Sequence, residues 1–113
     1  MNSLRNRVML IGRLGAQPET KQLANGSAMA RFSLATSESY KNDKGERVEE
    51  TQWHSLIAWG KVAEIAGKYL SKGKEVAIEG KLVTRQYTDK EGVKRYSTEV
   101  VVSDLLLIGN KTA

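Results

Sequence analysis

Apolar and polar residues alternate along several stretches of the chain, and this alternation is typical of half-buried β-strands. In residues 28–34 every second side chain is apolar, while Met29, Arg31 and Ser33 lie between them. Because successive side chains of a strand point to opposite faces, this stretch is predicted to bury one face and to expose a basic one. The preceding pair Asn25-Gly26 favours a tight turn, since both residues tolerate positive φ.

Further strands are predicted on the same grounds. They cover residues 8–11, 51–59, 76–82 with an extension towards Tyr87, and 95–103. In residues 51–59 the alternation places Trp53 and Trp59 on one face with Ser55. The charged residues 38–50 predict a long hairpin loop or an extension of both flanking strands. The apolar run 105–108 is expected to close the core or to form a subunit contact.

The spacing of apolar residues changes after Gly60, from a period of two to one typical of a helix. One apolar stripe is predicted for Val62, Ile65, Ala66, Tyr69 and Leu70. Gly73 suits the left-handed conformation in which many helices end. We therefore expect one short helix of about three turns.

The order of three strands, one helix and two strands predicts the fold. It favours an all-β, five-stranded OB-fold barrel with one short helix between strands 3 and 4. A mixed sheet with the helix on one face is the alternative. At 113 residues the chain is expected to form one domain. Residues 1–108 are assigned to this domain and residues 109–113 to a short tail that contains no acidic residue.

Charge and composition narrow the function. Lys and Arg number 18 against 13 Asp and Glu, a net charge of +5 that favours a polyanionic partner without proving one. The chain has no cysteine, which excludes disulfides, thiolate nucleophiles and Cys-ligated zinc. The apolar run 8–11 is too short for a signal peptide or a membrane span, so we expect no membrane contact and a cytoplasmic location.

Four aromatic residues occur in polar or basic surroundings where a core residue is not expected. They are Tyr40, Trp53, Trp59 and Tyr87. An aromatic ring beside a cation offers a surface on which an unpaired nucleobase can stack, so the chain is predicted to bind single-stranded nucleic acid. From the residues alone, buried tryptophans and ordinary strand-end tyrosines remain open. Phe32, Tyr69 and Tyr96 are interpreted as structural.

Catalytic patterns have little support in the sequence. There is no Ser/His/Asp constellation and no H-E-x-x-H motif, and residues 60–68 do not match the spacing of a phosphate loop. His54 has no Cys or acidic pattern around it that predicts a metal site, and a hydrogen-bonded position at an interface is the better interpretation. No enzyme activity, metal or cofactor is therefore expected.

Several motifs, taken together and in order, resemble the bacterial single-stranded DNA-binding protein family. They are Asn6-Arg7-Val8, Gly12, Leu14-Gly15, Leu34 to Tyr40, Thr51-Gln52-Trp53-His54, Trp59-Gly60-Lys61, Ile78 to Leu82 and Arg95 to Val102. The resemblance covers residues 4–103. It implies an OB-fold homotetramer that binds and protects single-stranded DNA, independently of sequence, in replication, recombination and repair. It also implies a cytoplasmic location associated with the bacterial nucleoid.

Residue roles follow from the same resemblance. It implies that bases stack on the four aromatics named above and that His54 lies at the subunit contact. It implies phosphate contacts by Arg7, Lys21, Lys61, Lys72, Arg85 and Arg95. Ser55, Val83 and Gln86 stand where some relatives carry basic residues, which would lower affinity unless Lys81 compensates.

Two functional alternatives stay open, and a third is more distant. The nearer one is an OB-fold adaptor for replication restart, and the other is a single-stranded RNA binder, because stacking hardly distinguishes the sugars. A small nuclease is the distant third. Relatives usually carry an acidic C-terminal tip that recruits replication and repair enzymes, and residues 110–113 hold no acid, which puts such recruitment in doubt here.

Overall fold

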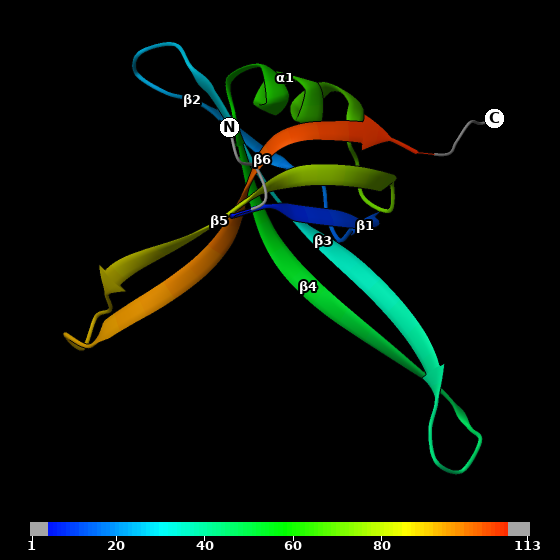
Figure 1. The fold of residues 1–113 in the computed structure, drawn as a ribbon. Helices are drawn as coiled ribbons and strands as arrows, with labels where there is room; N and C mark the ends of the chain where they lie inside the picture. The colour runs from blue at the N-terminus through cyan, green and yellow to red at the C-terminus, as the bar shows by residue number, and fades with distance from the viewer. Residues whose placement is uncertain (1–4, 109–113) are drawn as a thin grey trace.

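The computed structural model describes residues 5–108, and the predicted tail at 109–113 lies outside the described residues. Figure 1 shows strands and one helix in the described part of the chain. The elements are β1 (Val8–Leu14), β2 (Glu19–Gln22), β3 (Ala28–Lys41), β4 (Arg47–Trp59), α1 (Gly60–Tyr69), β5 (Glu75–Thr88) and β6 (Lys94–Leu107).

The strands form a closed barrel. Their order is β1-β5-β6-β4-β3-β2, and β1 pairs back with β3 through Arg13↔Ala35 and Leu14↔Leu34. The β4–β6 pairing is parallel, whereas the other pairings are antiparallel. The predicted five-stranded barrel with its helix between the third and fourth barrel strands is therefore confirmed. β2 is an addition that the sequence pattern did not predict, and it pairs with β3 outside the closed circuit.

The core fills the inside of this barrel and includes the predicted residues Phe32 and Leu34. α1 contributes Ala63, Ala66 and the following Leu70 to the core. The prediction that Ile65 and Tyr69 belong to the buried helical stripe is wrong, because both are exposed and α1 packs on the barrel through a narrow face that includes Ala63 and Ala66. Within residues 5–108 no helix is long and apolar enough to cross a membrane.

Two glycines allow the barrel strands to approach each other closely. A Cβ atom at Gly12 would lie 2.1 Å from the Ala35 carbonyl oxygen, and one at Gly80 would lie 2.1 Å from that of Val101. Gly80 also follows an irregularity in the β5–β6 register. Any larger residue at either position would force the backbone of the neighbouring strand to move.

Two long ribbons leave the barrel on the side away from α1, as Figure 1 shows. We call residues 36–51 the β3–β4 arm and residues 83–98 the β5–β6 arm. The radius of gyration is 16.4 Å, compared with about 13 Å for a compact domain of this length. Of the two predictions for residues 38–50, an extension of both strands is the one confirmed, because pairing continues to Lys41↔Arg47.

Candidate nucleic-acid interface

The candidate site begins with the side of β4 that faces away from the core. Leu56 and Ala58 are fully buried, whereas Trp53 is 61% exposed and Trp59 is 40% exposed. The prediction that the two tryptophans share an exposed face is confirmed, and the alternative of core tryptophans is wrong. Ile57 lies between them on the same face but is completely buried.

Cross-strand pairing extends this face over the neighbouring strands. The pairs Met29↔Trp59 and Lys21↔Met29 carry it to β3 and β2. The pairs Ile57↔Val101 and Lys81↔Val101 carry it in the other direction, to β6 and β5. We call the result the outer face, and on the barrel and the β5–β6 arm it comprises Glu19, Lys21, Met29, Arg31, Ser33, Ala35, Trp53, Ser55, Ile57, Trp59, Lys81, Val83, Arg85, Tyr87, Arg95, Ser97, Glu99 and Val101.

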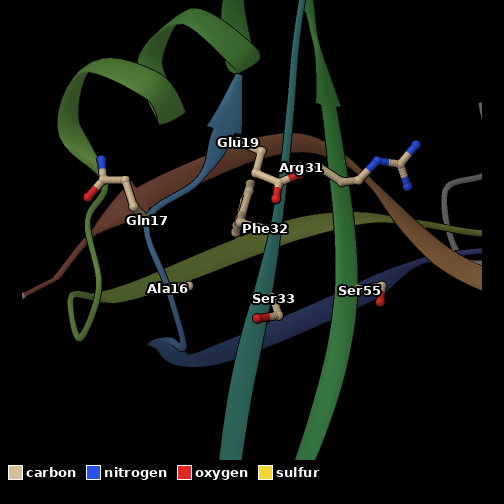
Figure 2. Close-up of a pocket in the computed structure, with 7 residues that line it drawn as sticks. All are labelled: Ala16, Gln17, Glu19, Arg31, Phe32, Ser33 and Ser55. Atoms are coloured by element: carbon tan, nitrogen blue, oxygen red, sulfur yellow. The ribbon is translucent and has the colours of Figure 1, made fainter. Parts of the chain in front are cut away.

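A shallow cleft of about 240 Å³ opens on this face beside Trp53. It is lined by Ala16, Gln17, Glu19, Arg31, Phe32, Ser33 and Ser55, which Figure 2 draws as sticks. The Trp53 ring covers Gly15 so closely that a Cβ there would lie 2.5 Å from Trp53 Cζ3. The indole is therefore supported on one side by backbone and leaves its other surface available for contact.

The predicted cations Lys21, Lys61 and Lys72 are exposed but lie in different places. Lys21 lies in one row with Met29 and Trp59 on the outer face. Lys61 is in the first turn of α1, two residues after Trp59. Lys72 is in the turn at the other end of α1, where the Gly73 amide donates to the Leu14 carbonyl at 2.8 Å. Strand pairing therefore places Lys21 on the outer face, whereas Lys61 lies in the first turn of α1 and Lys72 follows its last turn.

The predicted arginines take part in ion pairs within the protomer. Arg7 Nη2 lies 3.2 Å from Glu79 Oε2, and Arg95 Nε lies 2.9 Å from Asp89 Oδ2. The hydrogen bond from Arg95 is the main cause that lowers the pKa of Asp89 below its ordinary value. Exposed pairs of this kind contribute little to stability, so another anion can compete for these arginines.

Arg85 and Arg31 share one acidic partner. Arg85 Nε donates to Glu99 Oε1 at 3.0 Å, and Arg31 Nη1 donates to Glu99 Oε2. Among the described residues, Glu99 is the one charged residue that is buried, with an exposed fraction of 5%. Alternation in residues 28–34 did indicate that Arg31 faces outwards, but its link to Glu99 depends on strand register, which the sequence does not show.

The two predicted stacking tyrosines differ in their placement. Tyr87 pairs across the strands with Arg95, which puts a ring beside a cation on the outer face. Tyr40 pairs with Val48, and pairing is unbroken from there to Trp59. Strict alternation therefore places Tyr40 on the opposite face of the β3–β4 arm from Trp53. Both tyrosines are half-exposed, at 49% and 51%, so exposure does not separate them.

The remaining predictions concern His54 and two other tyrosines. His54 is half-buried, on the face opposite the tryptophans, with Nε2 at 3.0 Å from Thr36 Oγ1. Its predicted hydrogen bond is thus present, whereas its subunit contact stays a prediction. Tyr69 and Tyr96, interpreted from the sequence as structural residues, are both exposed, so neither ring belongs to the core. Tyr69 lies below Lys68, whose Nζ is 5.6 Å from the ring centre.

A closed five-stranded barrel that displays tryptophans among cations is the architecture of single-strand-binding OB-folds. Residues 5–108 match the Single-strand binding protein family, and the chain belongs to that family. It is 49% identical over 107 residues to single-stranded DNA-binding protein 1 of Chlorobaculum tepidum. It is 43% identical over 106 residues to the single-stranded DNA-binding protein of Neisseria meningitidis.

These alignments cover 94% of this chain but only 66% and 61% of the two relatives. The chain therefore spans about two thirds or less of the length of the curated relatives it matches. Among solved structures, a Plasmodium falciparum SSB in complex with single-stranded DNA has a TM-score of 0.84 and 34% sequence identity. That similarity covers 96% of this chain and 100% of the other.

Proposed function

We propose that this chain binds and protects single-stranded DNA, without reading its sequence, in replication, recombination and repair. The observation that carries the proposal is the outer face, where Trp53, Trp59 and Tyr87 are exposed among basic side chains on a barrel of this family. The relatives named above, and the DNA complex with a similar fold, support the same ligand.

Two physical terms supply the affinity. Stacking of unpaired bases on exposed rings contributes about 1–3 kcal/mol per base, and every base has a ring face to offer. Lys and Arg neutralise phosphates and release condensed counterions, which makes affinity fall as salt rises. Neither term depends on base identity, so binding without sequence preference follows.

Some positions of this chain lack the basic residue that relatives carry there, and they affect the strength of the proposed DNA binding. Ser55 lies on the outer face and lines the cleft, so its lack of charge reduces the phosphate attraction there. Gln86 pairs with Tyr96 on the opposite face of the β5–β6 arm, where a missing charge matters less. Lys81 lies on the outer face beside Val101, which supports its proposed compensating role.

We also propose a homotetramer, on the basis of a second exposed surface. Met9 and Ile11 of β1 and Leu106 of β6 are all well exposed, and Ala77 pairs with both Ile11 and Leu106. Apolar side chains gathered on one sheet face favour a protein contact over water. A symmetric assembly would cover this surface in every copy. We propose His54 as a further residue at a subunit contact.

Sedimentation velocity tests the assembly. We expect a single species with four times the protomer mass at micromolar concentration. The double variant Met9→Lys/Leu106→Lys should dissociate it, since each copy would place charges in the contact. A monomeric wild-type protein would contradict the proposed tetramer.

A tryptophan fluorescence titration tests the binding proposal. Adding oligo-dT of defined lengths should quench emission strongly, and affinity should decline between low and high salt. Trp53→Ala should weaken binding by about 1–3 kcal/mol with an unchanged far-UV circular dichroism spectrum. No quenching at low salt would contradict DNA binding, and equal competition by poly-U would redirect the proposal to single-stranded nucleic acid in general.

A further inference from the structure

Glu99 is a buried acid in the middle of a face that we propose for a polyanion. It is 5% exposed and lies on β6, between the tryptophans of β4 and Tyr87 of β5. An acid at this place opposes phosphate binding if charge alone matters. Neither base stacking nor phosphate neutralisation uses it, so its presence on this face requires a separate physical role.

The two arginines reach Glu99 from opposite sides. Arg85 belongs to β5, the neighbour of β6, whereas Arg31 belongs to β3 and has to cross β4. Figure 2 shows the Arg31 side chain extending from β3 across β4. Its cross-strand partner is Ile57, which is fully buried although it lies on the outer face. Arg31 therefore covers Ile57 with its apolar stem and joins three strands through Glu99.

Each guanidinium keeps further donors after it contacts Glu99. An arginine carries five N–H groups in a planar fork, and the two ion pairs with Glu99 use one nitrogen of each arginine. Both arginine side chains remain about half exposed, in contrast to the carboxylate between them. Together, the side chains of Arg31, Arg85 and Glu99 have a net charge of +1, because there are two guanidiniums and one carboxylate.

We propose that Glu99 is a positioning residue for DNA phosphates. It fixes Arg31 and Arg85 side by side on the outer face, so that their outward N–H groups form a preorganised phosphate seat between the tryptophans and Tyr87. Arg31 thereby becomes a phosphate contact that the sequence did not assign. The inference rests on the proposed binding of single-stranded DNA, and its physical basis is the smaller ordering cost of side chains that are already held.

The test compares two variants that make the same change in charge. Glu99→Gln removes the acid that holds the arginines, whereas the control Glu38→Gln removes an exposed acid on the opposite face of the β3–β4 arm. Electrostatics alone would tighten oligo-dT binding in both. We expect Glu38→Gln to bind as tightly as wild type or more tightly. We expect Glu99→Gln to bind about tenfold more weakly, the size of one hydrogen bond to a charged group.

The salt dependence of the same titrations separates positioning from a general loss of structure. Glu99→Gln should lower the slope of log K against log salt by about 0.7 for each phosphate that the arginines no longer neutralise, although the net charge of the protein rises. Equal or tighter binding by Glu99→Gln, or an unchanged slope, would overturn the proposal. Wild-type binding in the same experiment reports on the proposed function itself, so the two failures are distinguishable.

Arg31→Gln gives a second, independent measurement. In the wild-type background it should weaken binding and lower the salt slope, because it removes one cation of the phosphate seat. In the Glu99→Gln background it should have little further effect, because the arginine is no longer held. Additive effects would overturn the positioning role. If Glu99→Gln does not fold, the proposal stands or falls on whether Arg31→Gln in the wild-type background lowers both affinity and slope.

Discussion

The β3–β4 arm and the β5–β6 arm end in turns of the same construction. In the turn of the β3–β4 arm, Asn42 Oδ1 accepts hydrogen bonds from the amides of Lys44 and Glu46 at 2.9 and 3.0 Å. In the turn of the β5–β6 arm, Asp89 Oδ1 accepts hydrogen bonds from the amides of Glu91 and Val93, both at 2.9 Å. Gly45 and Gly92 follow three residues after the Asn and the Asp, with φ of 79° and 81°. Side-chain oxygens and a left-handed glycine thus determine both tips.

The arms differ in charge and in the face on which their tyrosine lies. The β3–β4 arm has five acidic and three basic residues, whereas the β5–β6 arm has two acidic and four basic ones. Their net charges are therefore −2 and +2. Tyr87 shares the outer face with the tryptophans and pairs with Arg95, but Tyr40 lies on the opposite face of its arm. Turns of the same type therefore close two arms that differ in charge and in the face of their tyrosine. We expect the β5–β6 arm to make most of the DNA contact.

Removing each tyrosine ring separately should reveal the largest difference in DNA affinity between the two arms. Tyr87→Ala is expected to weaken oligo-dT binding about tenfold, within the range measured when one stacking ring is removed. Tyr40→Ala should weaken it less than about threefold, because its ring lies off the outer face in an acidic arm. Fluorescence titrations at one salt concentration measure both. An effect of Tyr40→Ala as large as that of Tyr87→Ala would contradict the distinction between the arms.

The basic side chains of the two arms should show the next largest difference, in how much they contribute to the salt dependence of binding. Arg85→Gln/Arg95→Gln removes two cations of the outer face, and should lower the salt slope of binding by about 0.7 for each phosphate that is no longer neutralised. Lys41→Gln/Arg47→Gln makes the same charge change on the corresponding face of the β3–β4 arm, and should lower the slope less because that arm has a net charge of −2. Titrations over a range of salt concentrations give both slopes, and equal reductions would show that both arms contact phosphates.

Neutralisation of the acidic arm should produce a smaller effect of opposite sign. Glu49→Gln/Glu50→Gln is expected to tighten binding at low salt by less than about threefold, because exposed charges act weakly through water. The gain should disappear at high salt. Weaker binding by this variant would mean that the two acids hold the arm in a conformation that DNA requires, and the electrostatic explanation would then be wrong.

The smallest expected difference concerns the two tips and pH. The pKa of Asp89 is lowered chiefly by the hydrogen bond from Arg95 and by the Val93 amide, against a small opposing effect of burial. A lowered folded-state pKa means that Asp89 stabilises its tip above the ordinary pKa of 3.8, and that this stabilisation is lost as pH falls through the folded value. Asn42 does not titrate, so the two amide hydrogen bonds that its side-chain oxygen accepts should not respond.

Amide chemical shifts measured by NMR follow both tips through one acid titration. The Glu91 and Val93 amides should shift with a midpoint below 3.8, and the Lys44 and Glu46 amides should not shift with that midpoint. In Asp89→Asn the first pair should lose its response. Persistence of the same midpoint in Asp89→Asn would assign the titration to another group.

Much of the barrel could be predicted because its signals are local. Alternation in residues 28–34 and 51–59 requires no knowledge of partners, and the displayed face of Trp53 and Trp59 follows from it directly. β2 was missed because all four residues from Glu19 to Gln22 are exposed, so that strand exists only through its pairing with β3. The helical stripe was placed too widely, because a helix that packs through Ala63 and Ala66 buries a narrow strip.

The parts of the site that escaped prediction depend on register between distant segments. The face of Tyr40 is determined by pairing that continues without a bulge from Trp59 to Arg47, whereas the sequence also allowed a loop there. The contact of Arg31 with Glu99 joins residues 68 positions apart and depends on the parallel pairing of β4 with β6. No local pattern contains that information.

Photochemical cross-linking tests the central claim, that single-stranded DNA follows the outer face, most directly. A thymidine oligonucleotide that contains 5-iodouracil can be irradiated with the protein, and the modified peptides identified by mass spectrometry. We expect adducts at Trp53, Trp59 and Tyr87, while the exposed Tyr69 and Tyr96 serve as internal controls without adducts. Adducts concentrated at Tyr69 or Tyr96, with none at the tryptophans, would show that DNA takes another path and would contradict the claim.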